Sequence, residues 1–392
     1  MAQTRQLLER LGGLLEDHSI GSTYLTPPPR GGRLGGEARR EAERLLESLE
    51  AAVPGSADLI FGNGYFAVGR YSDAAAVYLN LLAADPESGT ARFNLGLAYI
   101  RLRRPDNAVA ELSRVLEQHP DFPEAYYQRG NAYDDLGERE LALADYDFAI
   151  ELNPDYLQAY YNRGVVLAGA GRHQEAVAAF DRVIDLRPTL SNAYLNRGVS
   201  LDELERHDQA IADYSTAIDF NPENADAFFN RARTYYYLGY IEEAVADYSQ
   251  VVDLRPEDGE AFNNRGLAYD AIEEYELALE DYDMALELQP RFAAALSNRG
   301  AAYEALGREA EALRDYLAAL ASDPEFAVAY YNSARLYAKE GEIDLCVEFL
   351  DQAVDLAPHL GEDAAEDDNL GWVLELRRLK RENPEEPPGR YR

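Results

Sequence analysis

Proline recurs every 34 residues through most of this 392-residue chain. The recurring prolines are Pro86, Pro120, Pro154, Pro188, Pro222, Pro256, Pro290, Pro324 and Pro358. They divide residues 55–360 into nine repeats, numbered 1 to 9 here, with the proline at position 32 of each repeat. A fixed period of roughly 20 to 50 residues predicts an array in which each repeat packs only on its neighbours.

Three further positions predict the fold of one repeat. Position 8 is Gly or Ala throughout, position 20 is Ala except for Cys346, and position 24 is a large apolar or aromatic residue. Apolar residues have helical spacing in two runs, separated by a break that is often glycine at position 15. Each repeat is therefore predicted to be two closely packed antiparallel helices, and proline ends the second helix. Stacked pairs of this kind form an all-α fold, an α-solenoid with a concave and a convex side.

These residues resemble the tetratricopeptide repeat. Repeat 3 matches its signature almost completely, with Gly130, Tyr133, Ala142, Tyr146 and Pro154 at positions 8, 11, 20, 24 and 32. The resemblance covers residues 55–360 and implies a right-handed superhelix whose first helices line a groove that holds peptides or other proteins. Repeats 1 and 9 depart from the signature, as terminal repeats commonly do.

The segments outside the repeats predict caps at both ends. Residues 1–54 contain an amphipathic helix with Leu7, Leu8, Leu11, Leu14 and Leu15 on one side, a Pro/Gly-rich linker at 21–36 and a capping helix at 37–52. The first of these helices is expected to dock on the solenoid or to act as a detachable arm. Residues 361–392 are expected to hold an acidic loop at 361–368, a capping helix around Trp372 and a polar tail at 382–392.

Position 6 of the first helix carries an amide in eight repeats. A carboxamide offers a donor and an acceptor together, which suits the backbone of an extended peptide. In some tetratricopeptide proteins such an asparagine ladder holds extended peptides, and the resemblance implies that role here. Four aromatic side chains on the same helices could receive apolar side chains of a partner. The predicted peptide-binding residues are Asn94, Gln128, Asn162, Asn196, Asn230, Asn264, Asn298, Asn332, Tyr127, Tyr161, Phe229 and Tyr236.

Two alternatives remain open for these side chains. Each amide could instead cap or brace its own helix backbone, and aromatic residues at helical spacing often belong to the core. Charged side chains are also expected in the groove. They include the acidic Glu124, Asp134, Asp202, Asp226, Glu260, Asp270 and Glu304 and the basic Arg101, Arg233, Arg335 and Lys339.

Arginine at position 7 has a structural interpretation. This position faces the second helix, where an unpaired guanidinium would be costly. Arg129, Arg197, Arg231, Arg265 and Arg299 occur in repeats that carry aspartate at position 23, namely Asp145, Asp213, Asp247, Asp281 and Asp315. We predict a partly buried ion pair in each of these repeats. Arg163 faces Ala179 at position 23, so it needs an acid from an adjoining repeat.

The composition narrows the function. A net charge of −35 disfavours nucleic acid and anionic membranes as partners. It either favours a neutral or basic protein or peptide partner or reflects solubility and general adaptation to salt. Because no apolar run approaches 18 residues and no export signal is evident, we expect a cytoplasmic protein without membrane insertion. The five histidines lie at loops or repeat boundaries, and Cys346 is the single cysteine, so we expect no catalytic residues, metal site or cofactor.

We therefore predict a scaffold, not an enzyme, that binds an extended segment of another protein in an asparagine-lined groove. The alternative is a self-assembling protein that forms homo-oligomers through its convex or terminal surfaces. In that case the groove would be empty or filled by the chain's own N-terminal arm.

Overall fold

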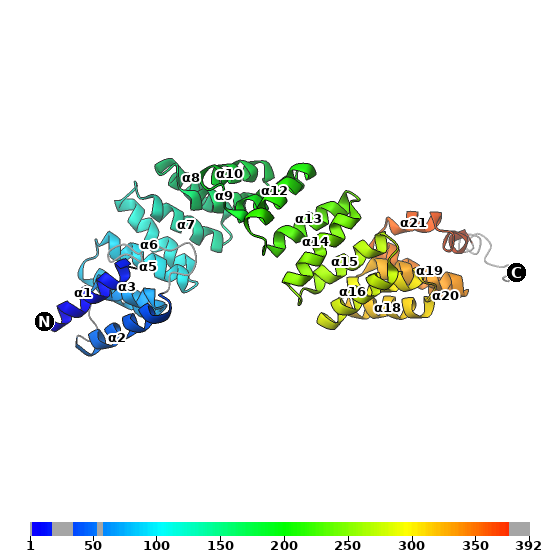
Figure 1. Cartoon of the computed structure of the whole chain (residues 1–392), viewed down its shortest axis with the longest axis horizontal. Helices are drawn as coiled ribbons and strands as arrows, with labels where there is room; N and C mark the ends of the chain where they lie inside the picture. Colours follow the sequence, from blue (N-terminus) through cyan, green and yellow to red (C-terminus); the bar gives the residue numbers. More distant parts are fainter. Residues whose placement is uncertain (1, 18–33, 53–57, 376–392) are drawn as a thin grey trace. The chain divides into compact units, whose positions relative to one another are not determined.

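The computed structural model describes residues 2–17, 34–52 and 58–375. Within these ranges the chain forms helices and no strand, which confirms the all-α prediction. The chain divides into two compact bodies, residues 1–206 and residues 207–392, called here the N-terminal and C-terminal bodies. Each body is an α-solenoid built from successive helix pairs (Figure 1).

The N-terminal body holds two leading helices, repeats 1 to 4 and the first helix of repeat 5. Its helices are α1 (Ala2–Asp17), α2 (Gly36–Ala52), α3 (Leu59–Ala67), α4 (Tyr71–Ala84), α5 (Gly89–Arg101), α6 (Pro105–Gln118), α7 (Pro123–Asp135), α8 (Arg139–Leu152), α9 (Leu157–Gly169), α10 (His173–Leu186) and α11 (Ser191–Asp202).

The C-terminal body holds the second helix of repeat 5, repeats 6 to 9 and a terminal helix. Its helices are α12 (His207–Phe220), α13 (Ala225–Tyr237), α14 (Ile241–Leu254), α15 (Gly259–Ala271), α16 (Tyr275–Leu288), α17 (Ala293–Ala305), α18 (Glu309–Ser322), α19 (Ala327–Glu340), α20 (Ile343–Leu356) and α21 (Leu360–Glu366).

Glycine at position 8 sets the close approach of the two helices in a repeat. A Cβ atom on Gly300 would lie 2.6 Å from the ring of Tyr316, and one on Gly266 would lie 2.7 Å from the ring of Tyr282. Both tyrosines occupy position 24 and are fully buried. The small residue therefore makes room for a large ring between the helices, as the sequence predicted.

Packing between repeats puts the first helices on one face. In both bodies each second helix packs against the first helix of the next repeat, for example α6 against α7 and α16 against α17. First helices also contact one another directly, as α5 does with α3 and α7, and α15 does with α17. Within each body, side chains that point outward from the first helices therefore share a surface, which we call the ladder face of that body.

Both ends of the array are capped. Helix α1 packs on α2 and α3, with Leu11 and Leu15 fully buried, so the N-terminal helix is docked and not detached. At the other end the predicted acidic loop at 361–368 is wrong. Its residues form α21, whose Leu360 and Ala364 are buried on one side and whose first turn carries acids that favour a helix N-terminus. The predicted tail at 382–392 and residues 21–33 of the predicted linker at 21–36 lie outside the described residues, and Gly36 already belongs to α2.

Position 15 has a left-handed backbone conformation in all nine described repeats. Three repeats place a non-glycine residue there, with φ of 55° at Arg103, 59° at Glu205 and 63° at Glu273. The other six use glycine: Gly69, Gly137, Gly171, Gly239, Gly307 and Gly341. This conformation costs a residue with a Cβ roughly 1 kcal/mol, whereas glycine adopts it freely.

Replacing Glu273 by glycine should therefore stabilise the protein. We expect Glu273→Gly to raise the free energy of unfolding by about 0.5 to 1 kcal/mol, measured by urea denaturation followed by circular dichroism. Glu273→Ala is the control, because it removes the same charge but keeps the Cβ atom. An equal gain from the alanine variant would show that the charge matters and the backbone conformation does not.

Candidate peptide-binding face

Four of the eight amides at position 6 donate a hydrogen bond to the preceding repeat. In the N-terminal body, Asn162 Nδ2 donates to Asn131 Oδ1 at 2.8 Å and to the hydroxyl of Tyr127 at 3.2 Å. Asn196 Nδ2 donates to the hydroxyl of Tyr161 at 2.9 Å. These bonds fix the plane of each carboxamide and link one first helix to the next.

The C-terminal body repeats this arrangement with different partners. Asn298 Nδ2 donates to Asn263 Oδ1 at 2.9 Å, and Asn263 Nδ2 donates to Asn264 Oδ1 at 3.2 Å. Asn230 differs, because its Nδ2 donates to the backbone carbonyl of Asp226 in its own helix at 2.8 Å. Asn230 thus braces the backbone of its own helix, as one of the two sequence-based alternatives predicted. Neither alternative predicted hydrogen bonds between the amides and the preceding repeat.

The two amides nearest the N-terminus are buried. Asn94 is fully buried and donates to Asn63 Oδ1 at 2.9 Å, an oxygen that also accepts from Tyr78 at 2.7 Å. Gln128 is 5% exposed, and its Oε1 accepts from Asn131 at 3.4 Å. The ladder face therefore presents its amides from Asn162 onward, where the position 6 side chains are partly exposed.

Three of the four predicted aromatic residues pack against the core. The rings of Tyr127, Tyr161 and Phe229 at position 5 contact the position 24 ring of the same repeat, with centroids 6.1, 5.9 and 5.7 Å apart. Tyr236 differs, since 37% of it is exposed, and its neighbour Tyr237 is 72% exposed. Tyr236 is thus the aromatic side chain of the predicted set most open to a partner, and Tyr237 lies exposed beside it.

Behind the ladder face, arginine at position 7 forms the predicted ion pairs. Arg265 Nε and Nη2 donate to the two oxygens of Asp281 at 2.7 and 2.6 Å, and the aspartate side chain is 5% exposed. The same bidentate geometry joins Arg129 to Asp145, Arg231 to Asp247 and Arg299 to Asp315. The hydrogen bonds that Arg265 donates to Asp281 raise the pKa of Arg265 above its ordinary value and outweigh the opposing effect of burial. Residues 197 and 213 belong to different bodies, so their pairing stays a prediction.

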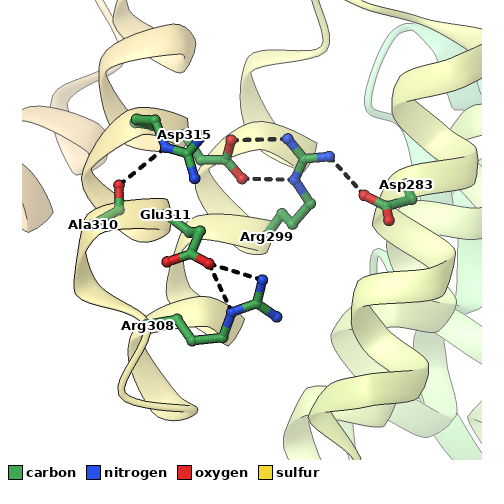
Figure 2. Close-up of polar contacts among 7 residues, drawn as sticks. Asp283, Arg299, Arg308, Ala310, Glu311 and Asp315 are labelled. Atoms are coloured by element: carbon green, nitrogen blue, oxygen red, sulfur yellow. Dashed lines mark hydrogen bonds and ion pairs between the residues drawn. The ribbon is translucent and has the colours of Figure 1, made fainter.

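The remaining nitrogen of each arginine reaches the preceding repeat. Arg265 Nη1 donates to Ser249 Oγ at 3.2 Å. Figure 2 shows the equivalent contact of Arg299, whose Nη1 donates to Asp283 Oδ1 at 2.6 Å. Arg163 bonds to Asp147 of repeat 3 at 2.7 Å, which confirms the prediction of an acid from an adjoining repeat. One guanidinium therefore joins both helices of its own repeat to the second helix before it, an arrangement we call the arginine fork.

The residue of the preceding repeat that accepts this hydrogen bond from the arginine always lies at position 25. This pairing is visible in the sequence only when neighbouring repeats are compared. Position 25 is serine or aspartate in each repeat that precedes an arginine at position 7: Ser113, Asp147, Asp181, Ser215, Ser249 and Asp283. It is Leu79 before Leu95 and Leu317 before Ser333, where the fork is absent.

Removing only the arginine of one fork should lower the free energy of unfolding strongly, whereas replacing both the arginine and its aspartate by apolar residues should not. Arg265→Met leaves Asp281 buried without its partner, so we expect the free energy of unfolding to fall by about 3 to 5 kcal/mol in urea denaturation. Arg265→Phe with Asp281→Val removes both charges and copies Phe61 and Val77 of repeat 1. This double variant should recover most of the loss, and a double variant no more stable than Arg265→Met would contradict the interpretation.

No cofactor site is evident in the part of the chain that the structure describes. Among those residues no group of three or more His, Cys, Asp or Glu side chains converges to hold a metal ion. Cys346 is buried, and burial raises the pKa of its thiol to about 11, so it has little thiolate character. None of the described helices is long and apolar enough to cross a membrane.

Comparison with known families agrees with this geometry. Models of the tetratricopeptide repeat match residues 61–125, 127–191, 259–292, 293–326 and 327–360, and a further TPR repeat model matches 201–239 and 232–272. The chain belongs to the tetratricopeptide repeat family. Membership of this family supports a protein-interaction scaffold and points to a non-catalytic role. No curated protein matches the sequence.

Solved structures resemble parts of the chain. The C-terminal part of a TPR repeat-containing protein from Cytophaga hutchinsonii is 17% identical, with a TM-score of 0.53 over 61% of this chain and 98% of that one, and it supports the fold. YrrB, described as a TPR protein with an unusual peptide-binding site, is 28% identical, with a TM-score of 0.42 over 47% of this chain and 95% of its own. MamA from Desulfovibrio magneticus RS-1 is 22% identical, with a TM-score of 0.43 over 44% of this chain and 97% of its own.

Proposed function

We propose that the ladder face binds an extended segment of another protein through its amides. The supporting observation is the orientation of these side chains. Asn162, Asn196 and Asn298 use Nδ2 to bond to the preceding repeat, while their Oδ1 atoms accept no hydrogen bond from the described residues and are not sealed from solvent. Each anchored amide therefore presents an acceptor that a peptide N–H can use.

The remaining accessible amides extend the same pattern. Asn264 uses its Oδ1 to accept from Asn263, which leaves its Nδ2 to donate to a peptide carbonyl. Asn230 keeps its Oδ1 for a donor. Asn332 is partly exposed on α19 at the same position. Because Asn94 and Gln128 are buried, we propose that they brace the face. The accessible amides of each body then contact a partner segment: Asn162 and Asn196 in the N-terminal body, and Asn230, Asn264, Asn298 and Asn332 in the C-terminal body.

Main-chain recognition implies low sequence selectivity from the amides themselves. Hydrogen bonds to backbone groups give affinity, and selectivity then comes from neighbouring side chains. The strongly acidic composition favours a partner segment that is neutral or basic, because an acidic segment would be repelled. Exposed Tyr236 offers an aromatic contact for such a segment.

The proposal predicts that amides on the ladder face control binding. Asn230→Ala, Asn264→Ala and Asn298→Ala together should weaken capture of peptides from an unbiased array of 12-residue sequences at least about tenfold. Stability should fall by only about 1 kcal/mol, since a single inter-repeat bond, that of Asn298, is lost.

A second triple variant serves as the control. Asn107→Ala, Gln250→Ala and Gln352→Ala remove three exposed amides from the second helices α6, α14 and α20. Capture should be unchanged in this variant. Equal capture by the wild type and the ladder variant would refute the proposed function.

A further inference from the structure

Two repeats of the C-terminal body carry a carboxylate at position 12 of the ladder face. Asp270 on α15 and Glu304 on α17 each accept a hydrogen bond from the position 24 tyrosine of the same repeat. The Tyr282 hydroxyl donates to Asp270 Oδ2 at 2.5 Å, and the Tyr316 hydroxyl donates to Glu304 Oε2 at 3.2 Å. The two carboxylates are thus held in the same way by one of their oxygens.

The second oxygen of Glu304 is satisfied by basic side chains from the next repeat. Arg335 Nη2 donates to Glu304 Oε1 at 2.6 Å, and Lys339 Nζ donates to the same oxygen at 3.0 Å. Arg335 and Lys339 lie at positions 9 and 13 of α19. Although burial raises the pKa of Glu304, these two cations outweigh it and hold that pKa below its usual value.

The second oxygen of Asp270 has no such donor. Positions 9 and 13 of the next repeat are Ala301 and Ala305 on α17, and both are exposed. Asp270 Oδ1 is shielded from solvent, and no described residue donates a hydrogen bond to it. Burial raises the pKa of Asp270 to about 6, against the opposing effect of the Tyr282 hydroxyl.

A shielded carboxylate oxygen without a donor is unfavourable, so this oxygen favours a group that brings a hydrogen bond and a positive charge. One carboxylate cannot form a metal site, and no cluster of metal-binding side chains occurs around it in the described residues. Arg335 and Lys339 approach Glu304 from α19, the first helix of the next repeat. The equivalent residues beside Asp270 are the exposed Ala301 and Ala305 of α17, which leave this place open. A long basic side chain has the reach and the donors for this place.

We propose that Asp270 binds an arginine or lysine side chain of the partner segment. This side chain would lie beside Asp270 in the place equivalent to that of Arg335 beside Glu304. This inference rests on the proposed function and adds to it the class of side chain that the face selects. The segment's backbone would lie along the amides, and one basic residue would enter between α15 and α17.

The first test places the basic side chain in the same molecule. Ala301→Arg copies Arg335, and Ala301→Gln is the neutral control of similar length. We expect Ala301→Arg to have a higher midpoint of urea unfolding than Ala301→Gln, and Asp270→Asn to abolish the difference. Equal midpoints of the two position 301 variants would contradict the proposed chemistry.

The second test uses peptides with the full chain. The probes are an acetylated, amidated nine-residue alanine–serine peptide with one central arginine and the same peptide with citrulline, which is neutral and of the same shape. Calorimetry should show about tenfold tighter binding of the arginine peptide to the wild type. Asp270→Asn and Ala301→Arg should each remove this preference and leave the affinity for the citrulline peptide unchanged.

The outcomes separate the two proposals. Equal affinity of the wild type for both peptides, or a preference for arginine that persists in Asp270→Asn, would overturn the assignment of Asp270 while the amide ladder stands. If neither peptide binds the wild type, the proposed function fails. The proposal that Asp270 binds a side chain of a partner segment then fails with it, even if Ala301→Arg stabilises the protein.

Discussion

The arginine fork is the interaction that fixes the stacking of the middle repeats. A helix pair buries its own apolar stripe but does not by itself fix how the next pair stacks. Arg299 ties both helices of its repeat together through Asp315 and fixes the preceding second helix through Asp283 (Figure 2). Buried pairs of this kind specify geometry more than they add stability, and here the specified geometry is the angle between neighbours. Where leucine replaces the polar residue at position 25, the arginine is absent from the next repeat as well.

The ladder face uses the same principle with uncharged groups. Position 6 is next to position 7 along the helix, so α17 directs Arg299 toward its second helix and Asn298 toward the preceding first helix. At Asn162 and Asn298 the amide bonds to the preceding repeat through nitrogen, and its oxygen accepts no hydrogen bond from the described residues. Under the proposed function, stacking and recognition share one set of side chains. A rigid, preoriented row of acceptors lowers the entropy lost when a peptide binds.

The sequence was sufficient for everything that one repeat determines by itself. The 34-residue period, the close approach at Gly300, the break between helices at position 15 and the ion pairs such as Arg265 with Asp281 all follow from spacing along one helix pair. Contacts between repeats could not be derived in this way, because they depend on the stacking angle. That is why the buried state of Asn94 and the role of Asn131 as an acceptor were missed. The helix at Leu360 was missed because its acidic composition suggested a loop.

Backbone hydrogen exchange with a bound peptide would show which face of the solenoid meets the partner. The protein would be measured alone and with the tightest-binding peptide selected from the unbiased array, and exchange would be followed by mass spectrometry for each helix. Binding along the ladder face predicts slower exchange in the first helices α13, α15 and α17 and little change in the second helices α14, α16 and α18. Protection confined to the second helices would contradict binding at the ladder face, because it would place the partner on the other face of the solenoid.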